Sequence, residues 1–277
     1  MLHSFNPQSE IRIPQSVYGP VNSWRVGRSL GVDLLCVGSV CSFRCVYCQL
    51  GRINVRTSER RVYVPTAKVM EDLRASAWRG ADVVTLSGSG EPTLAANMGE
   101  VIVEIKRLTR KPVLVLTNSA QLASARVRRE LCGADMVFCK LDAADEETFR
   151  SVNRPVAEVT LRSTVEGIRR LREEYAGRLA VQLMLMPLNK ASAREFAPLL
   201  GELRPDEVQL NSPLRPVPKR WTVDARGNLP QDGAAVARLK TVPAEEFAEF
   251  ADELRRLTGL KIVSRPGDPG AQALAPR

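Results

Sequence analysis

Short apolar runs rich in β-branched residues alternate with longer amphipathic stretches along most of the chain. The short runs have the length and composition of buried strands, and the longer stretches repeat apolar residues at the spacing of a helix with one buried face. Strands are therefore predicted at residues 32–37, 82–86, 113–116, 136–141, 180–186 and 207–210. Helices are predicted at residues 66–79, 95–108, 120–131, 159–175, 192–203 and 244–257. Each predicted strand is followed by a predicted helix, which is typical of parallel strands joined by right-handed crossovers.

Two architectures share this pattern: a doubly wound open sheet, and a barrel that is complete or partial. Cysteines or polar residues follow every predicted strand, beginning with Cys41 after the first and ending with Asn211 after the sixth. In a barrel all of these loops meet at one rim, whereas an open sheet uses two or three loops at its switch point. The sequence therefore predicts an α/β protein: a partial (βα)6 barrel of parallel strands with its site at the C-terminal rim.

The predicted elements suggest one main domain with two short flanks. Residues 18–264 are expected to form the barrel domain, residues 1–17 an N-terminal extension, and residues 265–277 a loose tail. Within the domain, residues 213–242 are rich in Pro, Arg and Gly and too long for a simple connection. We therefore expect them to form a lid or a segment that contacts the substrate.

The composition is that of a globular protein. The chain has 277 residues, of which 44% are hydrophobic and 26% are charged, values outside the disordered and fibrous classes. The longest apolar stretches, such as residues 181–188, fall well short of the roughly 20 residues that span a membrane. The N-terminus shows no apolar secretory segment. We expect a cytoplasmic protein with no membrane partner.

The chain has a single histidine, His3, which limits the catalytic mechanisms that are possible. It argues against Ser-His-Asp hydrolysis, Cys-His proteolysis and histidine-rich zinc sites, so the chemistry must use cysteine, carboxylate, lysine, arginine or a cofactor. Lys and Arg number 40 against 31 Asp and Glu, which gives a net charge of +9. A basic surface suits nucleic acid, but no RNA-binding motif accompanies it. RNA or tRNA therefore stays an open partner.

Three cysteines stand close together after the first predicted strand, in the pattern Cys41-x3-Cys45-x2-Cys48. A disulfide framework is not expected in the cytoplasm, so the spacing indicates metal or redox chemistry. A structural zinc ion needs four ligands, and Cys36 is the nearest candidate for the fourth. An iron–sulfur cubane on three thiolates leaves one iron open to a substrate or cosubstrate. A zinc knuckle and three buried thiols remain alternatives.

Two loops together resemble the radical S-adenosylmethionine (radical SAM) superfamily. The first is the cysteine motif, with the aromatic Tyr47 before its last cysteine. The second, residues 86–94, reads Leu-Ser-Gly-Ser-Gly-Glu-Pro-Thr-Leu and is similar to the superfamily's Gly-Gly-Glu-Pro motif, with Ser89 at the first glycine. The resemblance implies that this backbone accepts hydrogen bonds from the methionine ammonium group and that Glu91 secures the loop.

Further segments between residues 18 and 216 resemble one branch of the superfamily, which includes 4-demethylwyosine synthase and bacterial members of unassigned substrate. These segments include residues 140–143, 153–155 and 208–216. The archaeal tRNA enzymes carry three more cysteines ahead of the motif, where this chain has only Cys36. Cys132 and Cys139 are predicted to be ordinary buried thiols. Neither a second cluster nor demethylwyosine synthesis is therefore expected.

The resemblance also implies a reaction and its cofactors. A [4Fe-4S] cluster on Cys41, Cys45 and Cys48 would pass one electron to bound S-adenosylmethionine. The C5′–S bond would break, giving methionine and a 5′-deoxyadenosyl radical that abstracts hydrogen from the substrate. The residues expected to contact the cofactors are Tyr47, Ser89, Gly90, Glu91, Pro92, Thr117, Asn118 and Asn153.

Four more residues are assigned to the reaction. Lys140 and Asp142 are predicted to be catalytic, with a simple internal ion pair as an equal alternative. Asn211 and Arg215 are expected to contact the substrate. The electron donor is expected to be a flavodoxin or a ferredoxin. Two other functions stay open: cleavage of a different C–S bond with transfer of an aminocarboxypropyl group, and a non-catalytic iron–sulfur module that binds nucleic acid.

Overall fold

A computed structural model describes residues 15–190, 193–221, 226 and 235–265. Within these residues the central sheet has eight strands. Its spatial order is β1 (Val17–Ser23), β2 (Gly27–Val32), β5 (Val83–Leu86), β6 (Val113–Thr117), β7 (Met136–Lys140), β8 (Arg178–Met184), β9 (Glu207–Asn211) and β12 (Ile262–Ser264). β1 runs antiparallel to β2, and every other neighbouring pair is parallel. The carboxyl ends of the parallel strands therefore meet at one edge.

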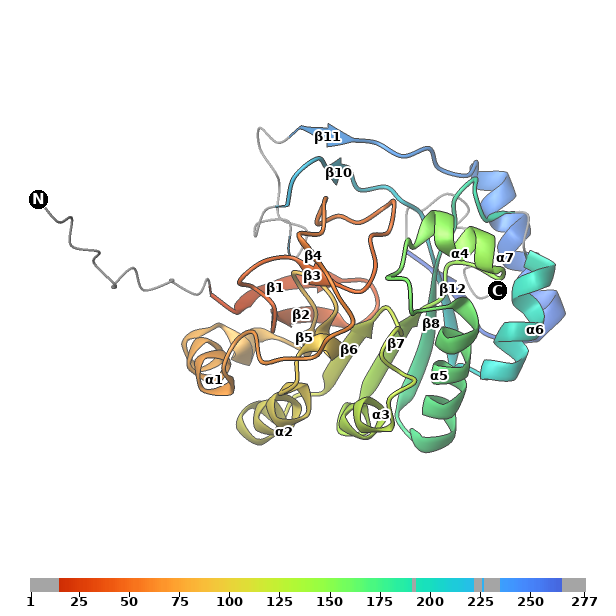
Figure 1. The fold of residues 1–277 in the computed structure, drawn as a ribbon. Coiled ribbons are helices and arrows are strands. Elements are labelled where there is room, and N and C mark those ends of the chain that lie inside the picture. Colours follow the sequence, from red (N-terminus) through yellow and green to blue (C-terminus); the bar gives the residue numbers. More distant parts are fainter. Residues whose placement is uncertain (1–14, 191–192, 222–225, 227–234, 266–277) are drawn as a thin grey trace, which may run out of the picture.

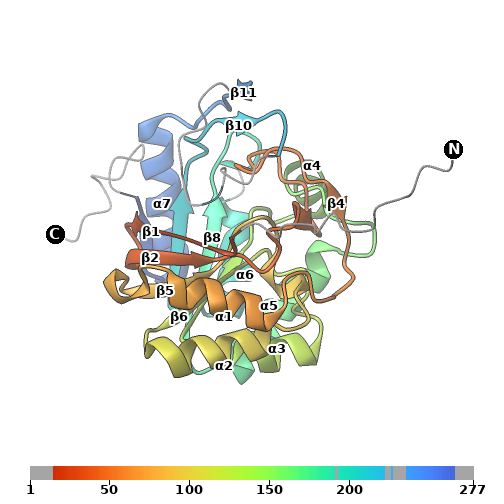
Figure 2. The ribbon, with the colours of Figure 1, turned by 90° about the vertical axis from the view of Figure 1, so that its left-hand side faces the viewer.

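The helices follow the strands in the chain and cover the sheet from outside. Figure 1 and Figure 2 show the first three helices side by side along one side of the sheet. The helices are α1 (Thr66–Ala75), α2 (Met98–Thr109), α3 (Ala125–Leu131), α4 (Glu146–Val152), α5 (Leu161–Glu174), α6 (Ala193–Leu203) and α7 (Ala244–Thr258), with short 3-10 turns η1 (Trp78–Gly80) and η2 (Pro92–Leu94). This is the alternation that the sequence predicts.

Two small strand pairs lie outside the main sheet. β3 (Val40–Cys41) pairs with β4 (Val55–Arg56), and β10 (Val217–Pro218) pairs with β11 (Val236–Ala237). In Figure 1, β10 and β11 lie at the top, and β3 and β4 lie between them and β1. The cysteine motif and part of residues 213–242 therefore lie at the same end of the molecule.

The strands are apolar on both faces because each face meets a separate core. Along β7, Val137 and Cys139 pack into the large core on the helix side, whereas Phe138 joins a small interior cluster with Leu114 and Ala180. The alternation follows from the period of two along a strand. The prediction that Phe138 and Cys139 lie on opposite faces is confirmed.

The predicted fold class is confirmed, but the position of the first strand is wrong. That strand is β2, which ends at Val32, and the apolar residues after it form a buried turn instead of a strand. Leu34 and Leu35 are buried there, and the backbone amide of Leu35 donates to Oδ1 of Asp33 at 2.9 Å. An apolar run that is buried as a turn resembles a buried strand in sequence. β1, β12 and α4 were not predicted.

The flanks that the sequence predicts are only partly described. Residues 1–14 and 266–277, and residues 222–225 and 227–234 within the predicted lid, lie outside the described part of the chain. The lid therefore stays a prediction. Among the described residues, no helix has both the length and the apolar character to span a membrane.

The start of β1 is attached to α1 by one carboxylate. Oδ2 of Asp72 accepts hydrogen bonds from the backbone amide and the hydroxyl of Ser16, at 2.8 and 2.7 Å. Nζ of Lys68 lies 2.8 Å from the other carboxylate oxygen. Burial acts to raise the pKa of Asp72, but the hydrogen bonds from Lys68 and Ser16 outweigh it and lower the pKa below its ordinary value. The ionised form is therefore the one that stabilises the fold.

Asp72→Asn should lower the free energy of unfolding by about 1–3 kcal/mol at pH 7, the value of hydrogen bonds to a charged group. A carboxylate with a lowered folded-state pKa contributes stability above its unfolded pKa of about 3.9 and loses that contribution as the pH falls through the folded value. The difference between wild type and variant in urea unfolding should therefore shrink below about pH 4. Glu71→Gln, at a neighbouring side chain that is 73% exposed, serves as control. A difference that stays constant down to pH 3 would contradict this assignment.

Candidate functional site

A cavity of about 760 Å³ lies at the carboxyl ends of the strands. Most of the residues that the sequence assigns to the site lie on its wall. They are Cys41, Cys45, Tyr47, Cys48, Gly90, Glu91, Thr117, Asn118, Lys140, Asn211 and Arg215. Four other assigned residues, Ser89, Pro92, Asp142 and Asn153, are buried behind the wall. The topology therefore brings together residues that end or follow five different strands, β2, β5, β6, β7 and β9.

Hydrogen-bond donors surround the sulfur atoms of the cysteine loop. The amide of Phe43 and Nδ2 of Asn118 each lie 3.4 Å from Sγ of Cys41, and Nδ2 of Asn153 lies 3.5 Å from Sγ of Cys45. The loop itself is attached to the end of α4, where the amide of Val46 donates to the carbonyl of Val152 at 2.9 Å. Donors in these positions stabilise negative charge on sulfur.

Burial dominates the electrostatics of the three thiols in the cysteine motif. Burial raises the pKa of Cys41 and Cys48, and that of Cys45 to about 12. Binding of iron by these sulfurs would therefore release protons.

Asp142 holds the cysteine loop, β7 and β8 together. Its Oδ1 accepts from the amide of Met184 at 2.8 Å and lies 3.3 Å from Nζ of Lys140. Its Oδ2 accepts from Nδ2 of Asn153 at 2.7 Å and from the hydroxyl of Tyr47. The side chain is fully buried. The Asp142 carboxylate thus positions its neighbours and does not itself reach the cavity.

Lys140 combines the ion pair with access to the cavity. Its ammonium nitrogen lies 4.7 Å from the centre of the Tyr47 ring, and the side chain is 20% exposed. A cation over an aromatic face is stabilised by the ring electrons. The internal ion pair that the sequence leaves open is present, and the same lysine can still contact a ligand.

Glu91 fastens the loop after β5 to the end of β6. Oε1 accepts from the amide and hydroxyl of Thr93 at 3.1 and 2.6 Å, and from the hydroxyl of Thr117 at 2.7 Å. Oε2 accepts from the amide of Asn118 at 2.6 Å. Burial is the main reason that the pKa of Glu91 is raised, and these hydrogen bonds oppose it. The carboxylate therefore fixes two neighbouring loops of the wall relative to each other.

A third buried carboxylate, Asp33, holds the preceding turn of that loop. Its Oδ2 accepts from the amide and hydroxyl of Ser89 at 3.0 and 2.6 Å, and from a guanidinium nitrogen of Arg226 at 3.2 Å. Gly88 has a φ of 141°, and a Cβ there would lie 2.3 Å from Cγ of Asp33. Ser89, where the radical SAM motif usually has glycine, therefore uses its side chain to bind Asp33.

Sequence reasoning missed several residues that line this wall or lie buried behind it. Asp33 directly follows β2, and its place at the end of a strand was hidden by the wrong position of the first strand. Trp24 and Arg25 lie in the unpredicted turn between β1 and β2, and Arg265 follows the unpredicted β12. No pattern in the sequence connects Arg226 to Asp33, because the two are paired only by the fold.

The remaining cysteines are separated from this cavity. Cys36 and Cys139 are buried in the helix-side core. Cys132 is exposed at the end of α3, so the prediction that it is buried is wrong. Its sulfur lies 3.5 Å from the carbonyl of Glu174, since α3 ends next to α5 at the surface.

Comparison with known proteins identifies the group to which this architecture belongs. The family model of the radical SAM superfamily matches residues 35–200. A UPF0026 protein of Synechocystis is 42% identical over 255 residues, which cover 91% of this chain and 96% of that protein. The chain belongs to the radical SAM superfamily, within the UPF0026 family. The resemblance stated from the two loops is thereby confirmed, and the protein is a radical SAM enzyme.

One further relative supports the same placement, and one solved structure shares the fold. A UPF0026 protein of Methanocaldococcus jannaschii is 32% identical over 211 residues, covering 74% of this chain and 65% of that protein. The structure of TYW1 with a lysine–pyruvate adduct bound has a TM-score of 0.62 at 16% identity, covering 85% of this chain and 76% of that one. At that identity the likeness to TYW1 shows the fold alone.

Asp142→Asn should destabilise this radical SAM enzyme by about 1–3 kcal/mol, the cost of an unsatisfied buried polar group. An amide has one acceptor oxygen, so it cannot serve Met184, Asn153 and Tyr47 together, and Lys140 loses its counter-charge. Urea unfolding of the reduced apoprotein measures the effect. Glu249→Gln, an exposed position on α7, is the control, and equal stability of the two variants would contradict the role of Asp142.

Proposed function

We propose that the protein binds a [4Fe-4S] cluster through Cys41, Cys45 and Cys48 and cleaves S-adenosylmethionine to generate a 5′-deoxyadenosyl radical. The observation that supports this most is that the three thiols and the loop held by Glu91 face one cavity. A cluster on three thiolates leaves one iron open, and the cavity is large enough for a cosubstrate beside it.

The loop between β5 and η2 fits the backbone contacts expected for the methionine group. A Cβ at Gly90 would lie 1.7 Å from the carbonyl oxygen of Val40, so no larger residue fits against the cysteine loop. The amides of Val40 and Glu91 bond to the carbonyls of Ser89 and Val40, each at 3.0 Å. We infer that the backbone of residues 88–91 would hold the methionine ammonium group directly beside the cysteine motif.

The other residues of the wall are proposed to contact the cluster sulfurs or parts of S-adenosylmethionine. When bound, the cofactors supply a one-electron reduction of a sulfonium and the radical that follows. Asn118 and Asn153 donate hydrogen bonds to the cysteine sulfurs, which favours negative charge there. We propose that Thr117 and Asn118 contact the ribose or the carboxylate of S-adenosylmethionine and that Tyr47 contacts its adenine. Lys140 supplies a positive charge at the wall for a carboxylate.

The other side of the cavity is proposed for the substrate. Asn211 ends β9, Arg215 follows it, and Gln182 and Met184 line the same wall from β8. In the sheet, β7 separates these positions from the loops after β5 and β6. The electron is proposed to come from a flavodoxin or a ferredoxin, since the reaction needs a one-electron donor.

Protein reconstituted without oxygen, then mixed with S-adenosylmethionine and dithionite, should release 5′-deoxyadenosine. Cys41→Ala, Cys45→Ala and Cys48→Ala should each lose most of their iron and reduce this release at least about 100-fold, because each removes a thiolate that would bind the cluster. Iron content and chromatography of the nucleosides are the measurements. Cys139→Ala, a buried cysteine on the helix side, should retain both.

The nucleoside released distinguishes this proposal from its alternatives. Methylthioadenosine in place of 5′-deoxyadenosine would assign the protein to aminocarboxypropyl transfer. Neither nucleoside, from protein with a complete cluster, would contradict cleavage and support a non-catalytic binding module.

Glu91→Gln should raise the KM for S-adenosylmethionine about tenfold while leaving the iron content unchanged. The amide NH2 group of a glutamine would face either Thr93 and Thr117 or the backbone amide of Asn118, all of which donate to Glu91. Two donors cannot bond to each other, so the two loops should separate. Glu100→Gln, an exposed position on α2, is the matched control. An unchanged KM, with a normal unfolding midpoint, would show that Glu91 does not position this loop.

A further inference from the structure

The wall of the cavity is strongly basic. Its charged side chains in the described part of the chain are Arg25, Lys140, Arg215, Arg226 and Arg265 against the single acid Glu91. Glu91 is already occupied by donors from Thr93, Thr117 and Asn118. An interior with this balance favours a ligand that brings negative charge of its own.

Two of the basic side chains form ion pairs with carboxylates that are buried behind the cavity wall. Lys140 pairs with Asp142, and Arg226 pairs with Asp33. Arg215 and Arg265 differ, because within the described residues neither forms an ion pair with a carboxylate. The one side-chain contact described for Arg215 is a hydrogen bond from its Nη1 to the amide oxygen of Gln49.

Both arginines line the same cavity and keep exposed surface. Desolvation of the Arg215 side chain lowers its pKa, and the positive charge of Arg265 lowers it further. A guanidinium presents parallel N–H groups that match the oxygens of a phosphate or carboxylate, and two such groups lining one cavity suit an oxyanion.

The position of this pair separates it from the loops proposed for S-adenosylmethionine. Arg215 follows β9 and Arg265 follows β12, at the far end of the sheet from β5 and β6. Arg25, from the turn between β1 and β2, donates to Oδ1 of Asn211 and so brings a third guanidinium to the same side. Trp24 stacks on Arg25, with the guanidinium 4.3 Å from its ring.

We propose that Arg215 and Arg265 form an anion subsite and that the substrate carries a phosphate or carboxylate group bound there. This rests on the proposed function, in which the opposite wall holds S-adenosylmethionine. The bound oxyanion removes the repulsion between the two arginines and orients the substrate with its reacting carbon toward the cysteine loop. The residues thus define a substrate class: small anionic molecules or anionic ends of larger ones.

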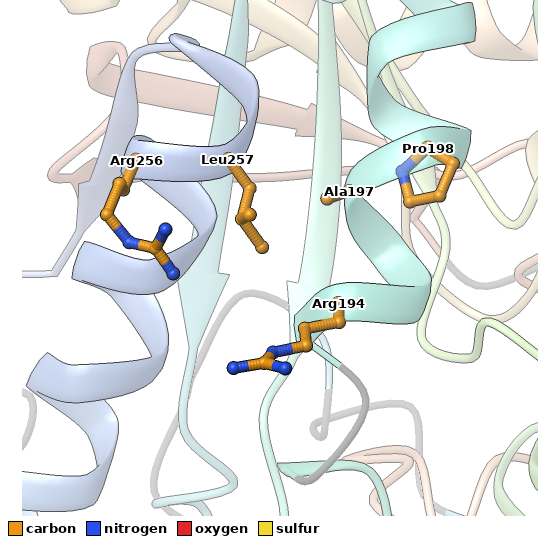
Figure 3. Close-up of a pocket in the computed structure, with 5 residues that line it drawn as sticks. All are labelled: Arg194, Ala197, Pro198, Arg256 and Leu257. Atoms are coloured by element: carbon orange, nitrogen blue, oxygen red, sulfur yellow. The ribbon is translucent and has the colours of Figure 1, made fainter.

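Isothermal titration calorimetry of the cluster-loaded protein, saturated with S-adenosylmethionine, tests the subsite with two probes, inorganic pyrophosphate and malonate. Arg215→Gln and Arg265→Gln are compared with Arg256→Gln. Figure 3 shows Arg256 on α7 facing α6 in a separate hollow of the surface. That control removes the same charge from the same basic protein, so it accounts for nonspecific attraction of anions.

Each variant of the pair should weaken binding of the better probe about tenfold relative to wild type, with the control unchanged. Preference for pyrophosphate would assign a phosphate, and preference for malonate a carboxylate. Equal probe binding by wild type and Arg215→Gln would overturn the subsite. The subsite would also be overturned if the two variants lost affinity for S-adenosylmethionine as strongly as for the probe. The arginines would then bind the carboxylate of S-adenosylmethionine. Release of 5′-deoxyadenosine tests the proposed function separately, because the titration requires no cleavage.

Discussion

A carboxylate removed from water must be surrounded by hydrogen-bond donors, and this requirement organises the rim of the barrel. Asp33, Glu91 and Asp142 are each at most 2% exposed, and each collects its donors from segments distant in the chain. Asp33 and Asp142 follow the ends of β2 and β7, and Glu91 lies in the loop after β5. Loss of any one acceptor would leave donors from at least two loops unsatisfied. These carboxylates therefore fix the loops around the cavity relative to one another.

The same requirement divides the cavity into two unlike halves. On the side of β5, β6 and β7, the carboxylates of Glu91 and Asp142 bind donors from neighbouring loops, so this wall is preorganised. On the side of β9 and β12, Arg215 and Arg265 keep donors that the described protein does not use. Preorganised polar groups suit cofactors that every turnover requires. The donors that the protein does not use suit a substrate that binds and is released in each turnover. Both halves meet at the cysteine loop through Tyr47 and Gln49.

The sequence was most informative where strands are apolar on both faces. β5 to β9 were predicted to within two residues because their runs are short, β-branched and followed by amphipathic helices. The first strand was misplaced because the buried turn at Leu34 and Leu35 is as apolar as a strand. β1 was missed because Gly19, Pro20, Asn22 and Ser23 are poor strand formers. Its pairing with β2 stabilises the strand although its residue propensities are low. The motif residues were placed on the wall, but the pairing of Arg226 with Asp33 depends on the fold alone.

The alternation along the strands has a consequence for how the family can diversify. Cavity-facing Gln182 and Met184 alternate with Val181 and Leu183, which belong to the core beneath the helices. Substitution of Gln182 or Met184 changes the side chains that meet a ligand in the cavity. Val181 and Leu183 continue to pack the sheet against its helices. Selection can therefore act on ligand preference at positions outside the helix-side core. One framework can thus supply enzymes for unrelated molecules within a single lineage.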